Sequence, residues 1–178
     1  MHMLLPSLRS LCIQGCSILE SFPDKGFPSS LKVLKIINCS RLVGSLKGAL
    51  TDNSSLETLW IIEPDVECFP DEGLLPLSLP SLIISNCPNL EKLDCKGLHQ
   101  LSSLQNLYLI SCLNLQSLPE EGLPKSISKL RIRDCPLLIS NTLPPSHRDC
   151  QLVRGTIYYG WSDNGPIADG LISPTNTR

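Results

Sequence analysis

The chain has 178 residues, of which 42% are hydrophobic, so it is long and apolar enough to bury the core of a single domain. A formal net charge of −2 and an isoelectric point near 5.9 provide no basic field, so we do not expect nucleic acid as a partner. Polar residues and prolines interrupt every apolar run before it reaches about 18 residues, the length of a membrane-spanning helix, so we expect no membrane contact either.

One spacing pattern, LxxLxLxxCxxL, recurs six times within residues 1–138. The copies begin near residues 8, 31, 56, 79, 104 and 127, so that successive copies are alternately 23 and 25 residues apart. Such regularity indicates an internal repeat. The patterned residues are Leu8, Leu11, Ile13, Cys16 and Leu19; Leu31, Leu34, Ile36, Cys39 and Leu42; Leu56, Leu59 and Ile61, with Pro64 in the cysteine position; Leu79, Leu82, Ile84, Cys87 and Leu90; Leu104, Leu107, Leu109, Cys112 and Leu115; and Ile127, Leu130, Ile132, Cys135 and Leu138.

The spacing of each copy has a physical cause. Side chains alternate between the two faces of a strand, so the fourth and sixth positions of a copy point into a core while the third, fifth and seventh point out. One copy cannot bury its own apolar edge, but stacked copies form a parallel sheet in which each copy covers the next. The predicted fold is therefore α/β: a leucine-rich-repeat solenoid that curves as a right-handed superhelix with the parallel sheet on its concave face.

Five of the nine cysteines occupy one position of the repeat, where the chain turns inward after the strand. A small thiol there can bond to free backbone groups of the turn while it stays buried. We interpret this position as a structural cysteine slot, occupied by Cys16, Cys39, Cys87, Cys112 and Cys135.

The segments that return along the convex side are of two predicted kinds. After odd copies they are proline- and glycine-rich, as in Phe22–Pro28, Phe69–Pro76 and Leu118–Pro124, which excludes a helix and predicts turns. After even copies, 48–56 and 97–104 have the apolar spacing of one or two helical turns. The convex side is thus expected to be mostly irregular with short helical turns.

The two ends differ from the repeats. No capping segment precedes Leu8, so the chain is expected to be cut from a longer solenoid. After Leu138 the pattern stops; we expect a partial C-terminal cap over residues 139–161 and a disordered tail over residues 162–178.

The outward strand positions predict a partner-binding surface on the concave face. Apolar and aromatic residues gather there in copies two to five, and basic residues follow on the sixth. Exposed apolar patches with aromatic anchors commonly mark contact sites, and basic edges pair with acidic groups of a partner. The alternative is that these residue types are present only because they favour strands. The predicted contact residues are Val33, Lys35, Ile37, Trp60, Ile62, Ile83, Tyr108, Ile110, Lys129, Arg131 and Arg133.

Catalytic and metal chemistry are not expected. Cys95 with His99, and His147 with Cys150, have spacings near that of a zinc site but belong to different parts of the predicted solenoid. No histidine is placed beside a slot cysteine as a base, and no GxxxxGK[ST] phosphate loop is present. We therefore predict no enzyme activity, no catalytic residue, no metal and no cofactor.

The expected compartment is the cytoplasm. The start, Met1 to Leu5, is not of the secretion-signal type, and the odd number of cysteines argues against an extracellular disulfide framework. Two glycosylation sequons, which begin at Asn38 and Asn53, are the features that favour secretion, but such triplets are frequent by chance.

The phrases Ile36–Leu42, Ile84–Leu90 and Ile132–Leu138, together with the Phe/Leu-Pro-acidic-x-Gly backs, resemble the C-terminal repeat region of plant intracellular nucleotide-binding leucine-rich-repeat disease resistance proteins of the coiled-coil type. The resemblance covers about residues 4–161. Cys135, Pro136 and Leu138 match the ending of that family's last repeat, Arg148, Cys150, Gly155 and Trp161 match its next stretch loosely, and the chain departs from the family after Trp161.

This resemblance implies a sensor and autoinhibitory module that acts in defence. Its partners would be a pathogen effector or host protein and the nucleotide-binding domain of the same or a related receptor. Two alternatives stay open: a leucine-rich-repeat substrate adaptor of an F-box ubiquitin ligase, and a fragment of an extracellular repeat receptor. The Ile-Thr-Asp-x-Gly phrase usual in the first, and the Gly-x-Ile-Pro phrase and paired-cysteine caps usual in the second, are missing from this sequence.

Overall fold

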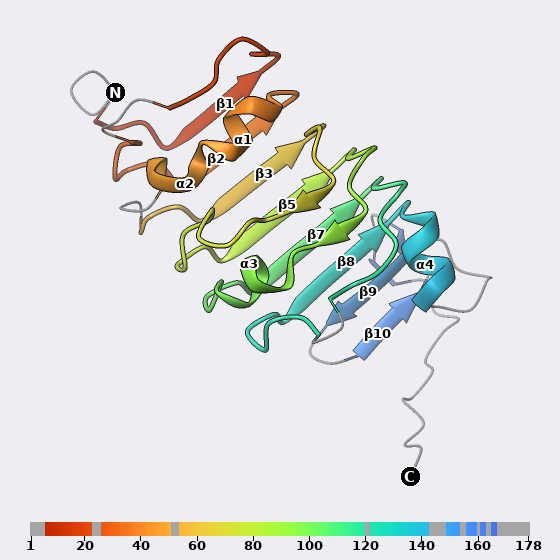
Figure 1. The fold of residues 1–178 in the computed structure, drawn as a ribbon. Helices are drawn as coiled ribbons and strands as arrows, with labels where there is room; N and C mark the ends of the chain where they lie inside the picture. The colour runs from red at the N-terminus through yellow and green to blue at the C-terminus, as the bar shows by residue number, and fades with distance from the viewer. Residues whose placement is uncertain are drawn as a thin grey trace.

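The computed structural model describes residues 6–22, 26–50, 54–119, 122–142, 149–153, 156–159, 161–162 and 165–166. Its main feature is a single sheet of eight strands, with the order β1-β2-β3-β5-β7-β8-β9-β10 (Figure 1). The first six run parallel, and β9 and β10 continue the sheet in antiparallel directions. Their bounds are β1 (Ser10–Gln14), β2 (Val33–Ile37), β3 (Thr58–Ile62), β5 (Ser81–Ser85), β7 (Asn106–Ile110), β8 (Lys129–Arg133), β9 (Asp149–Val153) and β10 (Thr156–Tyr159).

The six parallel strands coincide with the six copies of the repeat. Each strand covers the third to seventh positions of its copy, and each pairs with the next without a shift in register, so that Leu59 lies opposite Leu34 on one side and Leu82 on the other. The predicted parallel sheet is thus confirmed. With a few short helices beside it, the chain has an α/β fold that is compatible with a repeat solenoid.

The inward side chains of the strands form the core. Leu34, Leu59, Leu82 and Leu107 have no exposed surface, and the sixth positions beside them are at most 1% exposed from β2 to β7. Leu11 and Ile13 of β1 pack against this core but are only half-buried, since β1 lies at the edge of the sheet. Burial therefore depends on having a neighbouring copy on both sides.

The helices lie on one face of the sheet (Figure 1) and are all short: α1 (Ser40–Gly44), α2 (Leu46–Ala49), α3 (Cys95–His99) and α4 (Pro136–Thr142). The prediction for the segment after copy two was wrong in position: the helical turns are α1 and α2, which end at Ala49, whereas the described residues 54–56 of the predicted segment 48–56 are not helical. Leu42, Val43 and Leu46 place their side chains in the core, and Gly48, at φ +96°, leaves the helical conformation.

Helix α3 begins slightly earlier than the predicted 97–104 and ends at His99. Its start is fixed by Asp94, whose side chain accepts a hydrogen bond of 2.8 Å from the Gly97 amide and so caps the helix. Leu98 then fills the core beneath it.

The proline-rich return segments contain no helix among their described residues, as predicted. The structure adds a feature that was not predicted: β4 (Cys68–Phe69) pairs in parallel with β6 (Lys92–Leu93), and Lys92 forms a further bridge with Ser117. Phe69 is 2% exposed and anchors this strip to the core. Consecutive return segments are therefore hydrogen-bonded to one another.

The C-terminal part holds more regular structure than the sequence indicated. After α4, strand β9 pairs with β8, so it covers the edge that the last copy would otherwise leave open. The short strands β11 (Trp161–Ser162) and β12 (Gly165–Pro166) also pair. Except for these residues, the predicted tail over 162–178 lies outside the described part of the chain. Within that part, no helix has the length and apolarity needed to cross a membrane.

Candidate binding surface

The outward side chains of the six parallel strands form three rows across the sheet. Because the strands pair without any shift, the third, fifth and seventh positions of successive copies lie directly beside one another. The first row is Ser10, Val33, Thr58, Ser81, Asn106 and Lys129; the central row is Cys12, Lys35, Trp60, Ile83, Tyr108 and Arg131; the third row is Gln14, Ile37, Ile62, Ser85, Ile110 and Arg133. All eleven predicted contact residues therefore lie on one face.

Two cation–π contacts organise the central row. The Lys35 ammonium lies over the Trp60 ring, 4.6 Å from the centroid, and the Lys129 ammonium lies 5.6 Å from the centroid of the Tyr108 ring. Each contact joins neighbouring strands, β2 to β3 and β7 to β8. Such contacts hold the two aromatic side chains in defined positions on the outward face.

The sequence prediction was wrong about the exposure of Ile83. It was expected to be an exposed contact residue, but it is only 4% exposed. Its neighbours in the row are Trp60 on one side and Tyr108 on the other, and these larger side chains shield it. Ile83 thus supports the two rings, while they present the surface.

The other predicted residues remain partly accessible. Ile37, Ile62 and Ile110 in the third row are half-buried, as is Val33 in the first row. At the β8 end, Arg133 has its Nε 3.7 Å from an Asp134 carboxylate oxygen. The face therefore carries a central apolar region that ends in a basic edge at Lys129, Arg131 and Arg133.

A second repeated feature, which the sequence analysis missed, lies where the strands end. The residue after each parallel strand has a positive φ, between 50° and 66°, and it is glycine only in the first copy. In the first five copies the amide at this position donates to the carbonyl of the next strand, as Asn38 does to Ile62 over 2.9 Å, so the ladder extends by one bond. The positions are Gly15, Asn38, Glu63, Asn86, Ser111 and Asp134. Asparagine and aspartate tolerate this conformation better than most residues, which is the signal that the sequence held.

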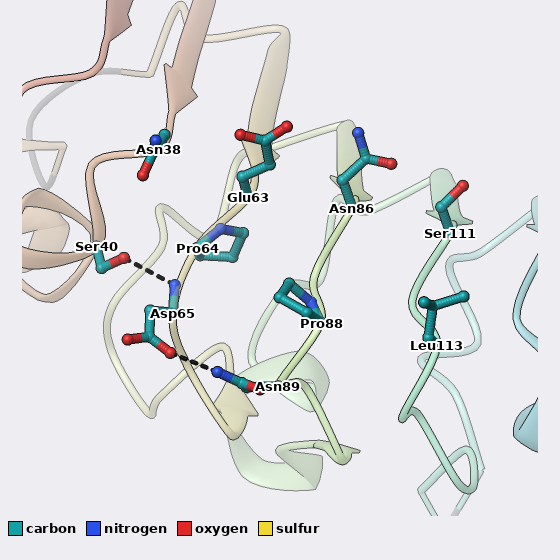
Figure 2. Close-up of a pocket in the computed structure, with 10 residues that line it drawn as sticks. All are labelled: Asn38, Ser40, Glu63, Pro64, Asp65, Asn86, Pro88, Asn89, Ser111 and Leu113. Carbon is teal, nitrogen blue, oxygen red and sulfur yellow. Dashed lines mark hydrogen bonds between the residues drawn. The ribbon is translucent and has the colours of Figure 1, made fainter.

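Four of these turns line an open groove of about 570 Å³ along the carboxyl ends of β2, β3, β5 and β7. Two hydrogen bonds join residues of its lining (Figure 2): the Asp65 amide donates to the Ser40 hydroxyl, and the Asn89 side chain donates to the Asp65 carboxylate, each over 2.7 Å. Its lining is Asn38, Ser40, Glu63, Pro64, Asp65, Asn86, Pro88, Asn89, Ser111 and Leu113. The groove thus adds a polar rim beside the sheet face.

Glu63 is the residue in this series with the least suitable side chain for its backbone conformation, at φ +55°. A left-handed conformation destabilises a residue with a Cβ by about 1–2 kcal/mol. Replacement by glycine removes this strain, but the greater flexibility of glycine in the unfolded state offsets part of the gain in stability. We expect Glu63→Gly to raise the free energy of unfolding by about 1 kcal/mol relative to Glu63→Ala, measured by urea denaturation. The alanine variant removes the same carboxylate but keeps the Cβ; equal stabilities would show that the backbone is not strained there.

The slot cysteines form a buried series along the turns. Cys39, Cys87, Cys112 and Cys135 are at most 1% exposed. Each thiol donates to the backbone carbonyl two residues earlier, at sulfur–oxygen distances of 3.1 to 3.6 Å, as Cys39 does to Ile37. Cys112 and Cys135 also reach a carbonyl of the preceding strand, and Cys16 in the first copy is half-buried. The thiols therefore satisfy backbone carbonyls at the strand ends and stabilise the turns.

Protonation supports this interpretation of the slot. The largest influence on the pKa of Cys112, a hydrogen bond with the Cys135 thiol, lowers it, but a hydrogen bond with Cys87 and burial outweigh that effect and raise the pKa to about 12. The pKa of Cys135 is raised as well, first by its hydrogen bond with Cys112 and then by burial. Since the thiolate is the reactive form, both thiols are expected to be inert near neutral pH.

Alkylation should separate these thiols from the exposed one. Cys12, in the central row of the outward face, is exposed, whereas Cys112 and Cys135 are buried and protonated. We expect iodoacetamide at pH 8 to modify Cys12 about 100-fold or more faster than Cys112, because modification of Cys112 requires local opening. Peptide mapping by mass spectrometry gives both rates in one sample. Comparable rates without denaturant would contradict the buried slot.

Of the two pairs considered for metal binding, the structure describes the side chains of one, Cys95 and His99. The Cys95 thiol lies 3.9 Å from Nδ1 of His99, whose Nε2 is 3.0 Å from the Gly122 carbonyl oxygen. His147 and the side chain of Cys150 lie outside the described part of the chain, as does His2. Among the side chains that are described, no group of three histidine, cysteine or acidic residues is placed to hold a metal ion.

This chain is similar to a protein of Arabidopsis thaliana that is named as a candidate disease resistance protein, with 41% identity over an alignment of 159 residues. The alignment covers 75% of this chain, which spans about 11% of the relative's length. The similarity agrees with the predicted resemblance to plant disease resistance proteins. No family model and no solved structure match the chain.

Proposed function

We propose that this chain is a leucine-rich-repeat module of a plant disease resistance protein and that it acts by binding other proteins. Two findings support the proposal: the in-register parallel strands at the repeat spacing, and the 41% identity to a protein named for disease resistance. In this proposal the six copies form a curved solenoid, with the sheet on its concave face. The chain works in the cytoplasm and carries no catalytic site.

The surface that binds is the outward face of the sheet. The observation that carries this assignment is the pair of aromatic side chains, Trp60 and Tyr108, held by lysines on either side of the buried Ile83. Rigid aromatic side chains at the centre of a face, with a basic edge beside them, are typical of protein contact sites. Strand propensity alone explains aromatic residues in strands, but not their joint position beside cations.

The proposed partners are a pathogen effector or host protein and the nucleotide-binding domain of the same or a related receptor. In this proposal any nucleotide chemistry of such a receptor lies in another part of the receptor, since this sequence contains no GxxxxGK[ST] phosphate loop. Binding of the nucleotide-binding domain would hold the receptor inactive, and a recognised protein would compete for or alter that contact.

The proposal is tested by calorimetric titration of the purified chain with a separately purified nucleotide-binding domain from a related disease resistance protein. We expect Trp60→Ala and Tyr108→Ala each to weaken binding by about 30-fold, the usual effect of removing a central aromatic anchor. The matched control is Leu77→Ala, which removes a side chain that is 56% exposed in a return segment. Binding that is lost equally in Leu77→Ala, or that is unchanged in all three variants, would reject the outward face.

A further inference from the structure

The outward face differs in charge from the rest of the chain. Its eighteen positions contain four basic residues, Lys35, Lys129, Arg131 and Arg133, and no acidic residue. The chain as a whole has 15 basic and 17 acidic residues, so this face carries +4 while all other positions together carry −6. A face that excludes acidic residues in an acidic protein is complementary to an acidic partner.

The cations are placed at both ends of the apolar centre. Along the central row, Lys35 lies on β2 and Arg131 on β8, with Trp60, Ile83 and Tyr108 between them. Four strand spacings of about 4.8 Å separate these two ends, a span of about 19 Å. The Lys35 and Lys129 contacts with aromatic rings position these ammonium groups, and because an aromatic ring carries no net charge, each ammonium can still pair with a carboxylate of a partner.

The neighbouring row decides between an acidic protein and a nucleic acid. Ile37, Ile62 and Ile110 lie beside the central row on β2, β3 and β7 and are half-buried. Apolar side chains at these positions match apolar side chains of a protein and offer nothing to a phosphate backbone. The overall charge of −2 also opposes a polyanion, which needs many more cations than four.

We infer that the outward sheet face binds an acidic amphipathic segment of a partner protein, with an apolar centre that packs on Trp60 and Tyr108 and carboxylates near both ends. An α-helix of about 13 residues spans the required 19 Å at a rise of about 1.5 Å per residue. The inference rests on the proposed function for the choice of face, and it adds the chemistry of the partner.

The test uses Trp60 as its own reporter. The chain has two tryptophans, so Trp161→Phe leaves Trp60 as the single one. Its fluorescence is followed while a 13-residue stapled helical peptide is added, which has a leucine-rich central turn and glutamates in its first and last turns. Two matched peptides replace the glutamates with glutamine or with lysine. We expect saturable binding of the glutamate peptide, about tenfold weaker binding of the glutamine peptide and none of the lysine peptide.

Charge variants on the protein provide the second arm. Lys35→Gln combined with Arg131→Gln should abolish the preference for glutamate over glutamine, whereas Lys96→Gln, an exposed change on α3, should leave it intact. The preference should also fall with added salt. Equal binding of all three peptides, no binding of any, or tighter binding of a single-stranded 13-nucleotide DNA would each overturn the inference.

Failure of this inference can be distinguished from failure of the proposed function. If the nucleotide-binding domain binds and Trp60→Ala abolishes that binding, while Lys35→Gln with Arg131→Gln has no effect, the face binds protein but not through acidic groups. Only the inference then fails.

Discussion

Gly97→Ala is expected to cost at least about 3 kcal/mol of unfolding free energy, more than a methyl group usually does, because backbone atoms occupy the space it needs. A Cβ at this position would lie 1.8 Å from the Pro70 carbonyl oxygen and 2.8 Å from the Pro70 carbonyl carbon. Neither atom belongs to a flexible side chain. Helix α3 would have to move away from the preceding return segment, and the cap at Asp94 would move with it.

The matched control is Gly44→Ala in α1, where a Cβ would meet no atom within 4 Å. There the alanine should stabilise the chain by up to about 1 kcal/mol, since glycine is the poorer helix former. Urea denaturation followed by circular dichroism gives both values. Similar stabilities of the two variants would contradict the close packing of α3 on the segment before it.

Leu82→Ala is the second change with a large expected effect, a loss of about 3–4 kcal/mol. Leu82 has no exposed surface and lies between Leu59 and Leu107 in the inward row, so the cavity opens in the middle of the core. Because each copy packs only on its neighbours, the loss weakens the interfaces on both sides of β5.

Leu11→Ala makes the same substitution at the same position of the repeat, but on β1 at the edge of the sheet. Leu11 is half-buried, so we expect a loss of about 1 kcal/mol. Thermal and urea unfolding of both variants measure the difference. Equal losses would mean that burial along the sheet does not depend on position, contrary to the structure.

The sheet could be predicted from the sequence because one physical rule governs it. Alternation along a strand assigns Leu34 and Ile36 to one face and Lys35 to the other, and the repeat spacing places copies beside one another. Register then follows without further information. The rows of the outward face, including the separation of cations from acidic residues, were therefore already present in the sequence.

The return segments could not be predicted as well, since their local signals are weak. Helices of four to seven residues are too short to be stable alone, so packing of Leu42, Leu46 and Leu98 on the core decides where they form. Likewise, the pairing of β4 with β6 depends on residues about 24 positions apart in separate copies.

Two properties of the outward face and its rim also depended on neighbours in space. The burial of Ile83 follows from the size of Trp60 and Tyr108, which precede and follow it by more than twenty residues. The groove beside the sheet is formed by several turns together. The sequence signal for these turns was limited to the asparagine or aspartate before the cysteine position, since these residues tolerate a positive φ.

Hydroxyl-radical footprinting tests the central claim most directly, because it reports the accessibility of individual side chains in a complex. The chain would be treated with hydroxyl radicals in the presence and absence of the nucleotide-binding domain of a related receptor. Mass spectrometry would then measure oxidation of Trp60, Tyr108 and Leu77. We expect oxidation of Trp60 and Tyr108 to fall severalfold in the complex, and that of Leu77 to stay unchanged. If Leu77 were protected in the complex while Trp60 and Tyr108 were oxidised as in the free chain, binding through the outward face would be contradicted.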